Sequence, residues 1–246
     1  IHVHIVVPNE FQNIAKYNIG ITAGIETTAC PPEWIDGLNR MDLNIVPAKF
    51  VKHTIENTKF DKHDENTKQV IGHLQSEKPI EVLFEGVDTD VFGKTNEFSK
   101  DLLDEFETIK DEFCFLHVGH WLQGNMGEDR KDLSMLVKVF CETFKNQKNP
   151  PALILKTSGA TPYVLHGDLR DEEINQLYNH PKVKAHVSFT HGEGFGRPLL
   201  EATLSEKPVI ASNWSGQTDF LNSDSVLLPG SLIDVPDTAL PKEFIV

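Results

Sequence analysis

Three glycines and two glutamates in one short stretch are the residues of this chain best suited to chemistry. Gly192, Gly194 and Gly196 occupy alternate positions, and seven residues separate Glu193 from Glu201. Glycines let backbone amides approach a ligand closely, and a helix start offers unpaired N–H groups and a partial positive charge to a phosphate. A carboxylate only accepts hydrogen bonds, so it suits neighbouring hydroxyls. The stretch therefore fits a ligand with a phosphate between two hydroxyl-rich ends, such as a nucleotide sugar.

The flanking residues predict a strand, the glycine loop, a helix and a second strand in succession. Ala185–Phe189 is short, apolar and partly alternating, which is typical of a strand. Pro198 suits the first turn of a helix, because its missing N–H would have no partner there. Lys207 and Pro208 end this helix, and the apolar run 209–211 is the next buried strand.

A family resemblance rests on this stretch and on the residues just after it. Glu193-Gly-Phe-Gly-Arg-Pro-Leu-Leu-Glu201, Lys207-Pro-Val-Ile-Ala and Ser215-Gly216 resemble the signature of retaining glycosyltransferases of family 4, which have the GT-B fold. The resemblance implies an α/β protein with two Rossmann-like domains and parallel sheets, the first incomplete in this chain. It implies a hexosyltransferase that moves a sugar from a UDP-, GDP- or ADP-sugar donor to a carbohydrate or other acceptor, without a metal or other cofactor.

The resemblance also assigns roles to particular residues. Glu193 and the Gly194–Gly196 amides would hold the donor sugar, and Glu201 the ribose hydroxyls. Arg130 and Lys131 best match the basic residue that grips the donor diphosphate in the family, and Lys156 is a second candidate. Ligands of parallel sheets bind at the carboxyl ends of the strands. The expected donor-binding residues are Gly119, His120, Arg130, Lys131, Lys156, Thr190, His191, Gly194, Phe195, Gly196, Glu201, Ser215 and Gly216.

Glu26 is the second catalytic candidate beside Glu193. It follows the predicted strand Asn18–Ala23, near the place where many family members carry a histidine beside the reacting sugar. The chain departs from the family here, as it does at His120, where the family often has arginine. A carboxylate at a turn or helix entry is the alternative interpretation of Glu26.

The alternation of apolar strands with helices predicts the domain organisation. We expect residues 1–85 to be a partial acceptor-side domain, 86–110 a linker region, and 111–246 the nucleotide-sugar-binding domain. Residues 58–79 are polar and are predicted as a solvated loop or short helix. Thr161-Pro162 leaves too few residues for the helix that a Rossmann unit needs, so we expect a loop to be missing there. The remaining predicted strands are 2–8, 42–47, 80–84, 113–119 and 152–156, and the remaining helices are 32–39, 48–57, 133–144 and 171–178.

Composition restricts the partners and the compartment. The formal net charge of −14 argues against a nucleic acid or an anionic membrane surface as the main partner. The three cysteines are far apart, which indicates a reducing compartment without a disulfide framework. No transmembrane segment or signal peptide is visible, so a cytoplasmic protein is expected.

Rival interpretations remain at this point. Asp88-Thr89-Asp90 is a DxD triplet, the metal-binding mark of GT-A glycosyltransferases, but it begins a linker and is interpreted as coincidental. Gly192, Gly194 and Gly196 also suggest a dinucleotide-dependent oxidoreductase, although the spacing GxGxG differs from the fingerprint. A non-catalytic sugar- or nucleotide-binding protein is the other alternative. His2 and His4 on one face of a strand are a weak metal candidate.

Overall fold

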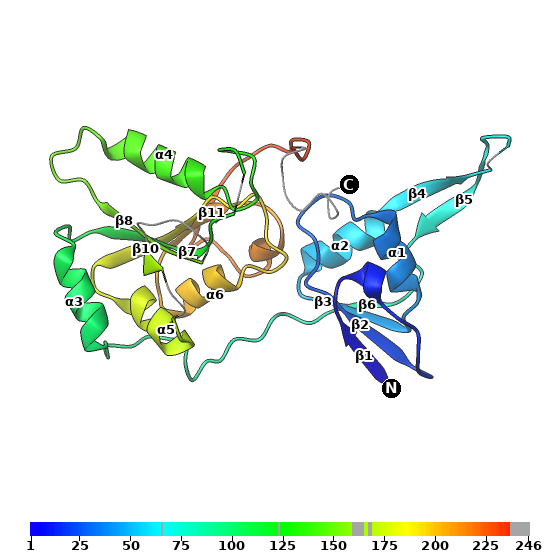
Figure 1. Cartoon of the computed structure of the whole chain (residues 1–246), viewed down its shortest axis with the longest axis horizontal. Helices are drawn as coiled ribbons and strands as arrows, with labels where there is room; N and C mark the ends of the chain where they lie inside the picture. Colours follow the sequence, from blue (N-terminus) through cyan, green and yellow to red (C-terminus); the bar gives the residue numbers. More distant parts are fainter. Residues whose placement is uncertain (65, 123, 159–164, 167–168, 237–246) are drawn as a thin grey trace.

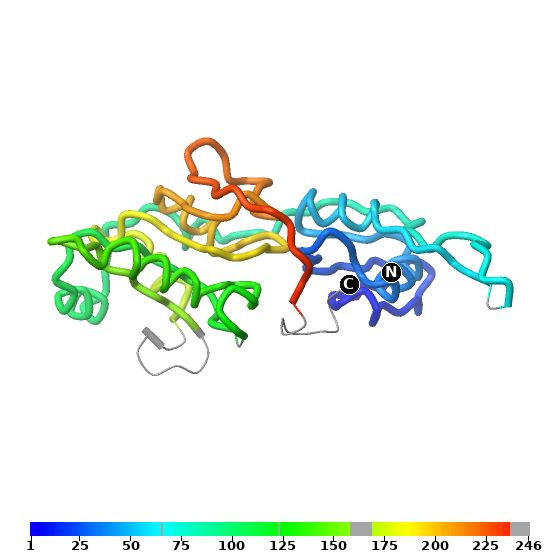
Figure 2. Tube along the Cα trace, turned by 90° about the horizontal axis from the view of Figure 1, so that it is seen from above, coloured from blue at the N-terminus to red at the C-terminus, as the bar shows by residue number. Residues whose placement is uncertain are grey.

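The chain folds into two α/β lobes joined by an extended segment (Figure 1). The computed structural model describes residues 1–236 except 65, 123, 159–164 and 167–168. The junction at Thr161-Pro162 therefore lies outside the described residues. Seen from above, the two lobes lie side by side and the last described residues, in red, lead back toward the first lobe (Figure 2).

The first lobe is built on a parallel sheet of four strands in the order β1-β2-β3-β6. Apolar side chains such as Ile35 and Leu38 of α1 and Val51 and Ile55 of α2 are fully buried in its core. Pro32 begins α1, where its missing N–H costs nothing. The bounds are β1 (His2–Ile5), η1 (Pro8–Glu10), β2 (Asn18–Ile21), α1 (Pro32–Asn39), β3 (Leu43–Val46), α2 (Lys49–Asn57) and β6 (Ile80–Val82).

A β-hairpin replaces the loop or short helix expected at residues 58–79, so that prediction was wrong. Strands β4 (Lys59–His63) and β5 (Val70–Gln75) pair antiparallel, with Phe60 opposite Leu74. These two side chains are partly buried and pack against the core of the first lobe, which anchors the base of the hairpin. The rest of the ribbon projects away from the lobe (Figure 1).

The segment after β6 crosses to the second lobe and packs along it. Its amides donate to side chains of the second lobe: Gly93 N to Asn175 Oδ1 at 3.1 Å and Ser99 N to Gln176 Oε1 at 2.7 Å. Helix α3 (Lys100–Thr108) begins at Ser99, whose hydroxyl caps Leu102 N. Phe106 of α3 is buried in the core of the second lobe.

The second lobe has a six-stranded, wholly parallel sheet in the order β9-β8-β7-β10-β11-β12. The chain therefore starts in the middle at β7, winds outward to β9, returns to β10 on the other side of β7, and winds outward again. This is the doubly wound order in which a crevice opens between the two central strands at their carboxyl ends. The bounds are β7 (Cys114–His120), α4 (Leu133–Phe144), β8 (Ala152–Ser158), β9 (Leu165–His166), α5 (Asp171–Asn179), β10 (Val183–Ser188), α6 (Arg197–Leu204), β11 (Val209–Ser212), η2 (Gly216–Asp219) and β12 (Val226–Leu228).

Helices cover both faces of this sheet. Cys114 and Leu116 of β7 point into a core shared with α3, α5 and α6, whereas Phe115 between them packs into a second cluster with Leu133 and Leu136 of α4. Successive strand residues point to opposite faces, so α4 lies on one side and α5 and α6 on the other (Figure 1). Among the described residues, no helix has the length and apolarity needed to cross a bilayer.

Candidate donor site

The candidate site lies at the crevice between β7 and β10, where the strand order reverses. A cavity of about 10 Å³ sits there, and its lining includes His117, Gly119, Lys131, Ser188, Glu193 and Gly196. The lining thus comes from the ends of both central strands, from the loop after β7, and from the glycine loop that opens α6.

Backbone geometry at the glycine loop explains its composition. Gly196 is the N-cap of α6 with φ of +98°, a left-handed conformation that favours glycine. Arg197 and Pro198 then form the first turn, so the helix begins as predicted. The segment after β11 holds the glycine loop in place: Glu193 N donates to Ser215 Oγ at 2.8 Å, and Gly216 N donates to Glu193 O at 2.9 Å.

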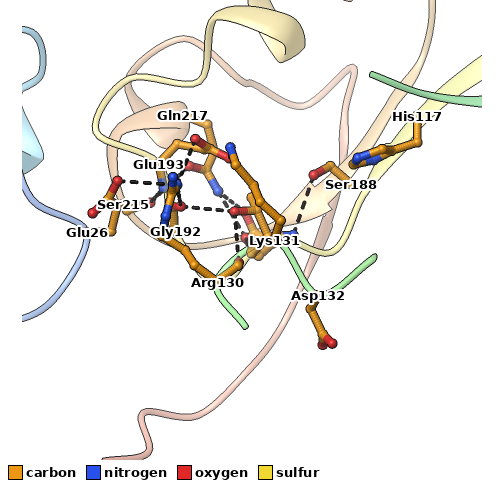
Figure 3. A network of polar contacts seen from close by, with 12 residues as sticks. Glu26, His117, Arg130, Lys131, Asp132, Ser188, Gly192, Glu193, Ser215 and Gln217 are labelled. Carbon is orange, nitrogen blue, oxygen red and sulfur yellow. Dashed lines mark hydrogen bonds and ion pairs between the residues drawn. The ribbon is translucent and has the colours of Figure 1, made fainter. Parts of the chain in front are cut away.

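Two cations meet the Glu193 carboxylate (Figure 3). Lys131 Nζ lies 2.5 Å from Glu193 Oε1, and Arg130 Nη1 donates to Glu193 Oε2 at 3.1 Å. The same Arg130 nitrogen donates to Gly192 O at 2.9 Å and pairs with Glu26 Oε1 at 3.3 Å. The exposed side-chain fractions of Lys131 and Glu193 are 10% and 14%, so this is a mostly buried ion pair.

The electrostatic environment separates the two carboxylates. Burial raises the pKa of Glu193, but Lys131 and Arg130 outweigh burial and leave the pKa below its usual value. Burial also raises the pKa of Glu26, and there it outweighs the opposing effect of Arg130, with Glu193 adding to the rise. Glu193 is therefore held as an anion more firmly than Glu26.

The first lobe closes over the glycine loop. A Cβ on Gly194 would lie 2.3 Å from Ala23 O, and one on Gly192 would lie 2.8 Å from Glu26 Cβ. The indole Nε1 of Trp214 donates to Glu26 O at 2.9 Å. The glycines thus permit the backbones of the two lobes to meet, and Glu26 reaches the cations from the first lobe.

Glu201 lies on α6, apart from the Glu193 cluster. Its carboxylate accepts from Arg197 Nε at 2.9 Å and from Tyr178 Oη at 3.4 Å. Burial raises the pKa of Glu201, and Arg197 opposes that rise. The start of α6 stands between Glu193 and Glu201, as expected from the sequence.

The other predicted residues divide into three groups. Thr190 and His191 contact the loop that carries Arg130: Thr190 Oγ1 donates to Arg130 O at 3.3 Å, and His191 N donates to the same oxygen at 2.7 Å. Gly119 and His120 end β7 at the mouth of the crevice. Lys156 is buried in β8 and forms no ion pair with a described residue.

The ring of Phe195 does not line the crevice. It is buried against two other rings, with centroids 6.0 Å from Phe84 and 5.2 Å from Phe220. Only the backbone of Phe195 remains to serve a ligand, alongside the Gly194 and Gly196 amides at the start of α6.

Sequence reasoning missed several residues of the site. His117 is fully buried in β7; its Nδ1 lies 3.0 Å from Val187 O, while its Nε2 has no partner among the described residues. Gln217 accepts from Ser215 Oγ at 2.9 Å and so fixes the hydroxyl that receives Glu193 N. Gln217 could have been found from its position directly after Ser215-Gly216, which belong to the family resemblance. His117 could not, because a histidine inside an apolar strand gives no sign in the sequence that it lines a site.

A family model matches part of the second lobe. Residues 130–243 match the model of the family described as Glycosyl transferases group 1. No curated protein matches the chain.

Solved structures resemble the chain at the level of the fold. HepE of Anabaena, in complex with UDP and glucose, gives a TM-score of 0.56 at 15% identity over 84% of this chain and 55% of that one. An α,α-trehalose-phosphate synthase (UDP-forming) of Burkholderia xenovorans, in complex with glucose-6-phosphate, gives 0.62 at 11% identity over 87% and 57%. The pneumococcal O-GlcNAc transferase GtfA, in complex with UDP and GlcNAc, gives 0.55 at 14% identity over 87% and 42%.

The chain spans only 42–57% of the length of these three structures, which agrees with the expectation of an incomplete first domain. The expected α/β architecture with two parallel sheets is confirmed. Residues 130–243 are thus similar to the glycosyl transferases group 1, and the fold of the chain is that of the GT-B glycosyltransferases.

Proposed function

We propose that the protein of which this chain is a part transfers a hexose from a nucleotide-sugar donor to an acceptor, with retention at the anomeric carbon and without a metal ion. The observation that carries the proposal is the buried Glu193–Lys131 pair beside Arg130, at the start of α6 and at the crevice between β7 and β10. The family-model match over residues 130–243 and the UDP-bound structures of similar fold support a nucleotide-sugar ligand.

The chemical task at this site is to stabilise a nucleoside diphosphate as it leaves the sugar. Fixed donors and cations do this well, because they need no reorganisation when negative charge develops. Arg130, Lys131 and the backbone amides at the start of α6 supply such groups within one crevice. Two cations and a helix start can replace a divalent metal, which is the basis for proposing metal independence.

Orientation of the donor follows from the order of groups along the chain. If the phosphates bind at the start of α6, the transferred sugar lies on the side of Glu193 and the ribose on the side of Glu201. Glu193 holds its charge and suits sugar hydroxyls. Glu26, the other catalytic candidate, enters from the first lobe and would act on the acceptor side of the sugar.

Calorimetric titration of two variants tests this orientation. Glu201→Gln should weaken the binding of a nucleoside diphosphate and of its sugar conjugate alike, because both ligands contain the ribose. Glu193→Gln should weaken the conjugate while changing the bare nucleotide much less. A loss for the bare nucleotide as large as that for the conjugate would contradict the assignment of the two ends.

The nucleotide itself is identified by thermal stabilisation with UDP, GDP and ADP, each with excess chelator. We expect one of the three to raise the melting temperature of the chain, since a ligand that binds only the folded state stabilises it. Stabilisation that appears only with manganese would contradict metal independence. Absence of stabilisation by all three would contradict the proposed function.

A further inference from the structure

We propose that Glu26 occupies Arg130 in competition with the donor diphosphate, so that donor binding exchanges one anion for the other and frees Glu26 for the acceptor. The inference rests on the proposed function and concerns the regulation of the same site. It also assigns residues 23–26, the first-lobe loop, a gating role over the glycine loop.

The charges of the cluster are already balanced within the protein. Arg130 and Lys131 face the carboxylates of Glu193 and Glu26. A single Arg130 nitrogen serves Gly192 O, Glu193 Oε2 and Glu26 Oε1 at 2.9, 3.1 and 3.3 Å. A diphosphate that takes over this nitrogen displaces an acceptor from it, and of its two carboxylate partners Glu26 lies at the longer distance.

The same loop occupies the space above the glycines. Ala23 O and Glu26 Cβ lie so close to Gly194 and Gly192 that a Cβ on either glycine would overlap them. The cavity at the crevice is about 10 Å³, whereas ligand pockets typically measure ~300–1,000 Å³, so a nucleoside diphosphate does not fit the crevice as it stands. We expect the first-lobe loop to move away from the glycines when the donor enters, which is the step that breaks the Glu26–Arg130 pair.

The contacts that hold the loop are few enough to be exchanged. Glu26 and Arg130 keep 29% and 36% of their side-chain area exposed, and such partly exposed pairs are weak. Ile25 holds the loop in the core of the first lobe, so the loop moves together with that lobe. Toward the second lobe, the loop is also held by the Trp214 indole on Glu26 O, and Trp214 packs on Phe50 with centroids 5.0 Å apart. A dianion can replace Glu26, the partly exposed carboxylate of the two on Arg130.

The test titrates the wild-type chain and the variants Glu26→Gln and Glu85→Gln at pH 7.5 with whichever of UDP, GDP and ADP stabilises the chain most. Glu85 is the matched control, because burial and the same Glu193 raise its pKa, while its cationic neighbour is Arg197. We expect Glu26→Gln to tighten binding about fivefold at pH 7.5, the upper limit for a partly exposed pair. Glu85→Gln should change it less than about twofold by the same reasoning.

Unchanged or weakened binding by Glu26→Gln, or an equal gain in Glu85→Gln, would overturn the inference while leaving the proposed function standing. Binding to neither wild type nor Glu26→Gln would overturn the proposed function, and the inference with it.

Discussion

Removing the Lys131 ammonium should reveal how strongly the site depends on its buried ion pair. Lys131→Met keeps the length of the aliphatic stem but leaves the Glu193 carboxylate with Arg130 alone. At 2.5 Å and an effective dielectric constant of ~20, the direct attraction is ~7 kcal/mol. Desolvation of the two ions offsets much of this attraction, which leaves a coupling of about 2–3 kcal/mol.

The single substitution should cost more than the coupling itself, because it strands a buried carboxylate. We expect Lys131→Met to destabilise the second lobe by about 3 kcal/mol, the low end for broken buried pairs, since Arg130 remains. That corresponds to a fall in melting temperature of about 6–12 °C for a protein of this size. Lys138→Met, which removes an exposed lysine on α4, should change the melting temperature little.

The assay is a double-mutant cycle read by scanning calorimetry at pH 7, with Glu193→Gln and the double variant. Glu193→Gln should recover part of the loss in the Lys131→Met background. Because the folded-state pKa of Glu193 is lowered, its contribution is present above the unfolded value of 4.5 and is lost as the pH falls through the folded pKa. A coupling below about 0.5 kcal/mol, or equal melting of Lys131→Met and Lys138→Met, would refute the reasoning.

Two further predictions concern the backbone contact and the buried histidines. Gly194→Ala should separate the lobes locally, because the added Cβ would overlap the backbone of the first lobe. Faster hydrogen exchange of the Trp214 indole N–H in NMR spectra would show this separation. Gly86→Ala is the control, because Gly86 has open space around it, and equal exchange in both variants would contradict the prediction. Burial lowers the pKa of His186 to about 3 and that of His117 to about 4, so folding loses stability as the pH falls from 6.5 toward these values, at ~1.4 kcal/mol per pH unit for each. His186→Leu should make the melting temperature fall less steeply as the pH is lowered below 6.5. An unchanged fall would show that another group controls the stability at acid pH.

Local pattern was sufficient for the elements around the glycine loop. Pro198 at a helix start, the apolar runs of β10 and β11, and the spacing of the two glutamates each depend on a few neighbouring residues. The hairpin was missed because, among the described residues of its ribbon, only Phe60 and Leu74 reach the core. One core-facing residue on each strand gives no periodicity that a short window can detect.

The candidate site was predictable only as far as its parts lie on one segment. The pairing of Glu26 with Arg130 joins residues 104 positions apart on different lobes. It depends on how the lobes dock, and no local propensity encodes that. The burial of His117 likewise follows from its neighbours in space, Val187 on β10 and the start of α6, and not from the apolar strand that contains it.

The central position of β7 has a consequence for how the protein reaches its native state. Its partner β10 lies about 70 residues further along the chain, as the pairing of His186 with Leu116 shows. Closing so large a loop costs entropy before any contact repays it, so we expect this pairing to form slowly and late in folding. The crevice between the two strands cannot exist before they pair, so a chain stalled before β10 docks would lack the candidate site. If the proposed nucleotide binds there, its binding during refolding would report when β7 and β10 have paired.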